Sequence, residues 1–86
     1  MSEIEDVKVI KFTIKMMKRK LQSDKSAVMQ AIRRSRAELK THYAPKQRKS
    51  WEYQKQAADL RADAFALKMW VITMENIIDK EKQKLL

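Results

Sequence analysis

Residues 7–40 read VKVIKFTIKMMKRKLQSDKSAVMQAIRRSRAELK, and two patterns run through this stretch side by side. In the first, apolar residues recur every three or four positions, which is the spacing of one face of an α-helix. These residues are Val7, Ile10, Ile14, Met17, Leu21, Val28, Ile32 and Leu39. The stretch therefore predicts one long amphipathic helix, over about residues 3–42.

The second pattern is a row of basic residues with the same period. Its members are Lys8, Lys11, Lys15, Lys18, Lys25, Arg33, Arg36 and Lys40. On a straight helix they fall within a sector of about 100°, and the row extends over about 48 Å at a rise of roughly 1.5 Å per residue. We call these eight residues the basic row, and we expect it to lie beside the apolar edge of the helix.

Two alternatives for this stretch stay open. Apolar residues also alternate with period two over residues 7–16, which is typical of a β-strand. Helix is favoured because the three-four spacing continues for several turns after the alternation stops. The polar stretch Ser23–Ser26 could also interrupt the helix and produce a three-helix fold, although both patterns keep their phase across it.

Residues 43–50 contain the one clear break in the helical pattern. Pro45 disfavours a helical conformation at Ala44, and Ser50 suits the N-cap of a second helix over about residues 51–84. The apolar residues of this second helix form a heptad seam, as in coiled coils. They are Tyr53, Ala57, Leu60, Ala64, Leu67, Val71, Met74, Ile78 and Leu85. The sequence thus predicts an all-α fold in which residues 1–86 form a single domain, an antiparallel hairpin of two long helices.

Each predicted helix also carries apolar residues away from this seam. They are Val9, Phe12 and Met16 on the first helix, and Phe65, Met69, Trp70 and Ile72 on the second. One hairpin partner covers only one stripe of a helix, so these residues predict a protein interface. A homodimeric four-helix bundle is the simplest closed arrangement. Packing against a different protein is the alternative.

Charge is distributed unevenly along the chain, whose net charge is +9. Residues 7–49 hold 14 Lys and Arg against Asp24 and Glu38, whereas residues 50–86 hold six residues of each sign. A cationic first helix suits an anionic partner. Cysteine is absent, and no signal peptide or membrane-spanning stretch is evident, so we expect a cytoplasmic protein. Binding to a membrane surface through the amphipathic residues 7–21 is a weaker alternative.

No pattern of catalytic or metal-binding residues stands out. His42 is the only histidine, and it lies in a basic region without a neighbouring acid or cysteine. The predicted second helix carries acids and bases that we interpret as exposed charge pairs along it, namely Asp59, Asp63, Glu75 and Asp79 with Arg61, Lys68 and Lys80. The sequence therefore predicts a non-enzymatic protein with no cofactor and no metal site.

Binding of DNA or RNA is the function that these patterns favour. Phosphate contacts would come from the basic row, from Arg34, and from Lys46, Arg48 and Lys49 in the loop. Tyr43, Trp51 and Tyr53 lie among the loop cations, where they would either stack on bases or close the end of the hairpin. The alternative function is a protein–protein adaptor or inhibitor that docks on an acidic groove of a partner, such as a nucleic-acid-processing enzyme.

Overall fold

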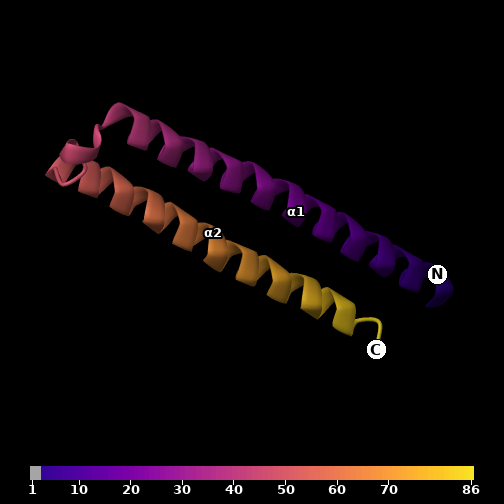
Figure 1. Ribbon diagram of the computed structural model, residues 1–86. Coiled ribbons are helices and arrows are strands. Elements are labelled where there is room, and N and C mark those ends of the chain that lie inside the picture. Colours follow the sequence, from indigo (N-terminus) through magenta and orange to yellow (C-terminus); the bar gives the residue numbers. More distant parts are fainter. Residues whose placement is uncertain (1–2) are drawn as a thin grey trace.

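The structure, a computed structural model, describes residues 3–86, with side chains described from residue 5 onward. Helix α1 comprises Glu3–His42, a short 3₁₀ helix comprises Pro45–Gln47, and helix α2 comprises Trp51–Gln83. The two long helices lie side by side and antiparallel, with both chain ends at the same end of the molecule (Figure 1). The hairpin is elongated, with extents of 67 × 16 × 13 Å. The predicted all-α hairpin is confirmed.

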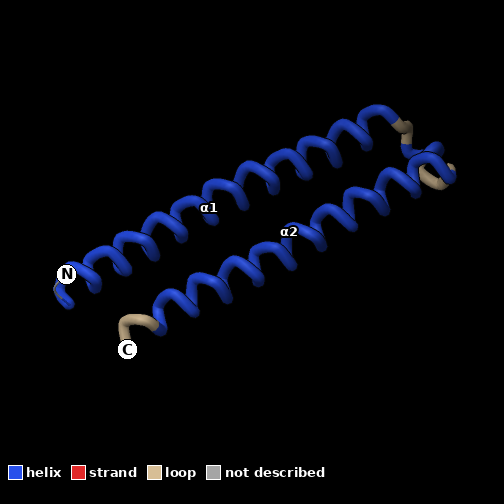
Figure 2. Tube along the Cα trace, turned by 180° about the vertical axis from the view of Figure 1, so that it is seen from behind, coloured by secondary structure: helices blue, strands red, loops and turns tan. Residues whose placement is uncertain are grey.

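Helix α1 is continuous from Glu3 to His42 (Figure 2). The two alternatives that the sequence left open, a strand over residues 7–16 and an interruption of the helix at Ser23–Ser26, are therefore both wrong. The helix contains neither glycine nor proline. Asp24, Lys25 and Ser26 are half-buried in the hairpin. Packing against α2 therefore covers the polar stretch, and a break there would uncover the apolar turns on both sides of it.

A network of hydrogen bonds closes the turn between the helices. The Ser50 hydroxyl accepts a hydrogen bond from the Tyr53 amide at 3.3 Å and caps α2, as the sequence predicted. The Arg48 guanidinium donates to the carbonyl of Lys40 at 3.1 Å, and the Gln54 side chain donates to the Arg48 carbonyl at 2.7 Å. These bonds satisfy polar groups at the end of α1 and across the loop.

Apolar side chains between the helices form a narrow seam. Every predicted seam residue of α2 is buried or half-buried, and Ile78 is the most buried, with 4% of its surface exposed. On α1 the buried residues are Ile14, Ile32 and Leu39. Val7 and Val28 are exposed, contrary to the predicted seam. Val7 lies near the end of α1 that extends beyond α2 (Figure 1), and Val28 lies at one edge of the seam.

The hairpin is too thin to cover its own apolar residues. Its accessible surface is 7140 Å², whereas a compact monomer of 10.2 kDa exposes about 5,300 Å². The exposed large apolar residues include Val9, Phe12, Met16, Trp51, Phe65, Met69, Trp70, Ile72 and Ile77. Neither helix within residues 3–86 has an apolar stretch of the length needed to cross a membrane.

Candidate nucleic-acid interface

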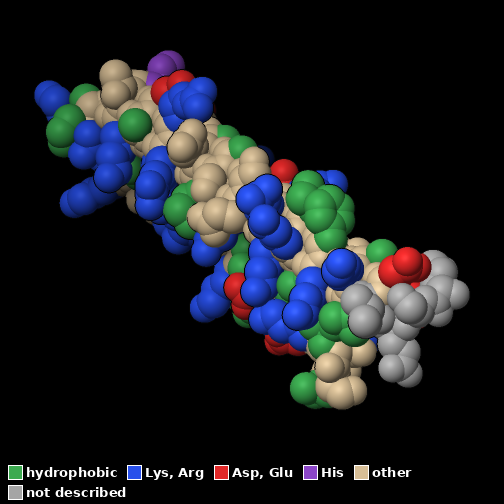
Figure 3. All heavy atoms as spheres, turned by 90° about the vertical axis from the view of Figure 1, so that its right-hand side faces the viewer, with side chains coloured by type: hydrophobic (Ala, Val, Ile, Leu, Met, Phe, Trp, Pro, Cys, Tyr) green, Lys and Arg blue, Asp and Glu red, His purple; other side chains and the backbone are tan. Residues whose placement is uncertain are grey.

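Two shallow grooves lie on one side of the seam, and basic side chains line both. The larger groove, of about 490 Å³, is lined by Lys25, Arg33 and Arg36 of α1 together with Lys68 of α2. The next groove towards the loop is lined by Arg36 and Lys40 of α1 and by Arg61 of α2. We call this side the basic face, defined by Lys25, Arg33, Arg36, Lys40, Arg61 and Lys68. Figure 3 shows Lys and Arg side chains gathered along one side of the elongated molecule.

The opposite side of the seam also carries two grooves, but their charged residues are mainly acidic. Asp24 of α1 and Asp63 of α2 line a groove of about 520 Å³. Glu38 and Asp59 line its neighbour near the loop, which has a volume of about 510 Å³. We call this side the acidic face, defined by Asp24, Glu38, Asp59 and Asp63.

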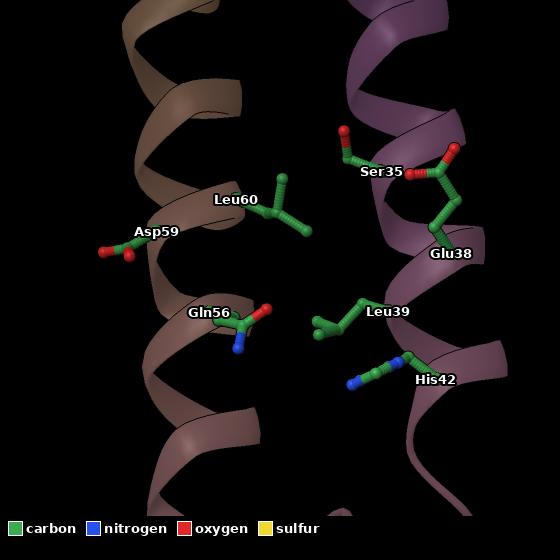
Figure 4. A pocket seen from close by; sticks show the side chains of 7 residues that line it. All are labelled: Ser35, Glu38, Leu39, His42, Gln56, Asp59 and Leu60. Carbon is green, nitrogen blue, oxygen red and sulfur yellow. The ribbon is translucent and has the colours of Figure 1, made fainter.

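A closer view of the groove near the loop shows how the seam and the acidic face are related (Figure 4). Leu39 and Leu60 point towards each other between the helices, whereas the Asp59 carboxylate points away from α1. The imidazole of His42 extends towards α2 and lines this groove with Gln56. The Leu pair thus forms the floor of the groove, and polar groups form its rim.

The charges of α2 between residues 59 and 68 are therefore sorted between the two faces. Asp59 and Asp63 lie on the acidic face, while Arg61 and Lys68 lie on the basic face. The charge pairing predicted along α2 is wrong for these four side chains, because none of them forms an ion pair with another described residue, whereas Asp79 pairs with Lys82. Residues two or five positions apart point about 200° or 140° apart on a helix, which places the opposite charges on opposite sides.

The basic face carries no compensating ion pairs either. Within the described residues, salt bridges link Lys82 to Asp79 at 3.8 Å and Lys84 to Glu81 at 2.9 Å, both near the end of α2. Lys25, Arg33, Arg36 and Lys40 have no such partner, and Glu75 is the one acid that lines their grooves. The basic face therefore presents a row of cations to solvent.

The basic row continues towards the chain ends in a different electrostatic setting. Lys18 lines a small groove together with Glu75, Asp79 and Lys82, so acids of α2 lie near this part of the row. Lys8, Lys11 and Lys15 are exposed on the N-terminal half of α1 and line none of the five grooves described. Arg34 is also exposed, but it lines none of these grooves, because adjacent residues such as Arg33 and Arg34 point about 100° apart on a helix. The structure thus brings together only the central part of the predicted set.

The three loop cations differ in what they do. Lys46 and Lys49 are exposed, as a phosphate contact requires. Arg48 is half-buried, its guanidinium bonds to the Lys40 carbonyl, and its Nε is buried without a hydrogen-bond partner. Arg48 therefore holds the turn together, and a phosphate-binding role for the loop depends on the two lysines.

The loop aromatics divide between the two predicted roles. Tyr43 and Tyr53 are half-buried and pack edge to face with ring centroids 5.6 Å apart, so they close the end of the hairpin. Gln56 donates a hydrogen bond to the Tyr43 hydroxyl at 3.2 Å. Trp51 does not join them: 74% of its surface is exposed, and the Lys55 ammonium lies 5.3 Å from its ring centroid. One of the three aromatics is thus left on the surface.

The predicted protein-interface residues are all exposed, but they do not form one surface. Trp70 lines the apolar centre of the acidic face with Val28, Ala31 and Ala66. Ile72 lines the basic face, on the other side of the seam. Phe65 and Met69 line neither groove, and Val9, Phe12 and Met16 lie on α1 away from both. One partner surface cannot cover Trp70 and Ile72 together.

Arg61 and Lys68 belong to the basic face, although neither was predicted as a binding residue from the sequence. The signal was present, because both residues lie beside the α2 seam on the same flank, seven positions apart. The position of that flank relative to the basic row depends on how the two helices are rotated against each other.

Comparisons with protein-family models, with curated proteins and with solved structures found no match to this chain. Within residues 3–86, no three His, Cys, Asp or Glu side chains are grouped so that they could hold a metal ion.

Proposed function

We propose that this protein binds nucleic acid through the phosphates that lie along its basic face. The observation that carries the proposal is the set of six cations from both helices that lie on one side of the seam with a single acid, Glu75, among them. A polyanion with regularly spaced phosphates complements such an array, and binding would release the counterions condensed on the nucleic acid.

The dimensions of the array also suit a nucleic acid. On α1 the basic face runs from Lys25 to Lys40, about 22 Å at roughly 1.5 Å per residue, which corresponds to about six or seven base pairs at 3.4 Å per phosphate of one strand. Arg33 and Arg36 would provide the best-defined contacts, because a guanidinium can bind a phosphate through two hydrogen bonds. The lysines would add affinity that does not depend on base sequence.

The proposal includes completion of the hairpin by another chain, either a second copy or a different protein. The hairpin exposes about 1,800 Å² more than a compact monomer of its mass, and a standard interface buries about 800 Å² per partner. The excess surface is thus large enough for one interface, with further area left for nucleic acid. We place the protein in the cytoplasm as a non-enzymatic component of such an assembly.

A salt titration tests the proposal. Fluorescence anisotropy of a labelled 20-base-pair DNA, its RNA duplex and the corresponding single strands is measured between 50 and 300 mM salt. If at least four phosphates are contacted, the logarithm of the association constant falls with the logarithm of salt concentration with a slope of about −3 to −4. No binding to any of these probes at 50 mM salt would refute the proposal, and so would a slope near zero.

A second candidate function is supported by the floor of the basic face. Met29, Val71 and Ile72 line the larger groove between the cations, so an amphipathic helix with acidic flanks would also fit it. In that case the protein is an adaptor or inhibitor of an acidic partner. Substitution Ile72→Gln separates the two functions: it should weaken docking of such a helix strongly and binding of nucleic acid little.

A further inference from the structure

The acidic face has a built-in apolar centre that the proposed nucleic-acid site does not use. Val28 and Ala31 of α1 lie across the seam from Ala66 and Trp70 of α2, above a floor made by Ile32 and Leu67. Trp70 is 37% exposed although it is one of the largest side chains of the molecule. Small residues such as Ala31, Ser35 and Ala66 allow another helix to approach closely.

We infer that a second copy of this chain covers the acidic face, so that two hairpins pack back to back with their basic faces on opposite sides of a four-helix bundle. This inference rests on the proposed completion of the hairpin. The resulting dimer is symmetric and carries two nucleic-acid sites.

Charge disfavours self-pairing of the basic face more than self-pairing of the acidic face. Two basic faces in contact would bring together six cations from each copy with only Glu75 to offset them, which disfavours a dimer through that side. The acidic face carries only four acids, and they surround an apolar groove. Lys20 lies one turn before Asp24, on the same side of α1, and would face the acids of the second copy at the rim.

Stacking of a basic face on an acidic face is the rival arrangement. The opposite charges of the two faces would attract each other, but one face of each kind would stay free at the ends of the stack, so the assembly would keep growing with concentration. Back-to-back packing closes at two copies, and the surface excess of about 1,800 Å² per chain can supply an interface of the size of stable dimers.

Sedimentation equilibrium of three proteins tests the inference. Trp70→Asp places a charge on the acidic face, and Ile72→Asp is its matched control, since Ile72 is 41% exposed on the same stretch of α2 but lies on the basic face. We expect the wild type and Ile72→Asp to have twice the chain mass of 10.2 kDa and Trp70→Asp to have half the mass of the wild type. A dimeric Trp70→Asp protein, a monomeric wild type, or a wild type that grows beyond two copies would each overturn it.

A second measurement avoids any loss of folding in Trp70→Asp. In the variant Trp51→Phe, Trp70 is the only tryptophan, because the chain has two. Its emission should shift to shorter wavelength as concentration rises through the dimer midpoint, and in the reciprocal variant Trp70→Phe the emission of Trp51 should not shift. An emission maximum of Trp70 that stays constant while the mass doubles would show that another surface forms the dimer.

A bridging assay then separates this inference from the proposed function. Bead-bound 20-base-pair DNA is mixed with protein and with a second, labelled duplex at low salt. The wild-type dimer should capture the labelled duplex, and Trp70→Asp should bind the bead-bound DNA but capture at least ten-fold less of the labelled one. Equal capture by both proteins overturns the inference. A dimer that binds neither duplex leaves the inference intact and refutes the proposed function.

Discussion

The two faces of the hairpin share a floor and differ in their rims. Ile32 and Leu67 lie beneath the central grooves of both faces. Cations surround the groove on the basic face, whereas two aspartates and several small or apolar residues surround the groove on the acidic face. The same seam thus supports two surfaces with opposite preferences, one for a polyanion and one for protein. The rotation of α2 against α1 creates this difference, because it brings like charges of the two helices to the same side.

Removal of a seam residue should have the largest effect, since it weakens both faces together. Ile78 is 4% exposed, and Ile78→Ala should lower the free energy of unfolding by about 2–5 kcal/mol, measured by urea denaturation. Ile72→Ala, the same change at a site that is 41% exposed, should cost less than about 1 kcal/mol. Equal losses for the two variants would mean that the seam is not the core of the molecule.

Charge reversal on the basic face should have the next largest effect. We expect Arg33→Glu with Arg36→Glu to lower the affinity for a DNA or RNA duplex about 10- to 100-fold at low salt and to reduce the salt slope by about two units. Arg34→Glu is the control, because Arg34 is exposed on the same helix but lines neither face. Its effect should stay within about three-fold. A loss for Arg34→Glu as large as for the pair would show that net charge, not the face, determines binding.

The sequence predicted the seam well because a heptad pattern reports which side of a single helix is apolar. All eight predicted seam residues of α2 are buried or half-buried, and so is Leu85 just after its end. The prediction was less accurate on α1, where Val28 lies at the edge of the seam and is 43% exposed. A straight helix of 3.6 residues per turn drifts against a seven-residue repeat, so the contact line moves round a helix of 40 residues.

The sorting of charge between the faces was not predicted, although the two seams imply it. Asp59 and Arg61 are two positions apart and lie on opposite flanks of the α2 seam, and which flank of α1 each one meets follows once the two seams face each other. That depends on the packing of Leu39 against Leu60 and of the other seam residues, which fixes the rotation of one helix against the other (Figure 4). Trp70 and Ile72 were also predicted as parts of one interface, but residues two positions apart point about 200° apart on a helix, and the two lie on different faces.

A change at Arg61 tests whether α2 contributes to the basic face, and a smaller effect is expected because one charge is removed and none is reversed. Arg61→Gln should lower the affinity for the duplex a few-fold and reduce the salt slope by about one unit. Asp59→Asn is its control, two residues away on the acidic face. It should leave the affinity unchanged or raise it slightly, since it removes a negative charge. If Arg61→Gln leaves the slope unchanged, phosphates contact α1 alone.

The smallest effect is expected at the part of the basic row where the two kinds of surface meet. Lys18 lies in a groove with Glu75 and Asp79, and these acids oppose the approach of a phosphate that Lys18 would attract. Lys40 lines a groove with Arg36 and Arg61 and with no acid. Lys18→Ala should therefore change the affinity for a duplex less than two-fold in the same anisotropy titration, whereas Lys40→Ala should lower it several-fold. Equal effects of the two substitutions would mean that the nucleic acid follows the whole basic row of α1 and that the acids of α2 do not limit the site. The pair of variants thus measures how far the basic face extends along the hairpin, because the two lysines occupy the same row and differ in the charges that surround them.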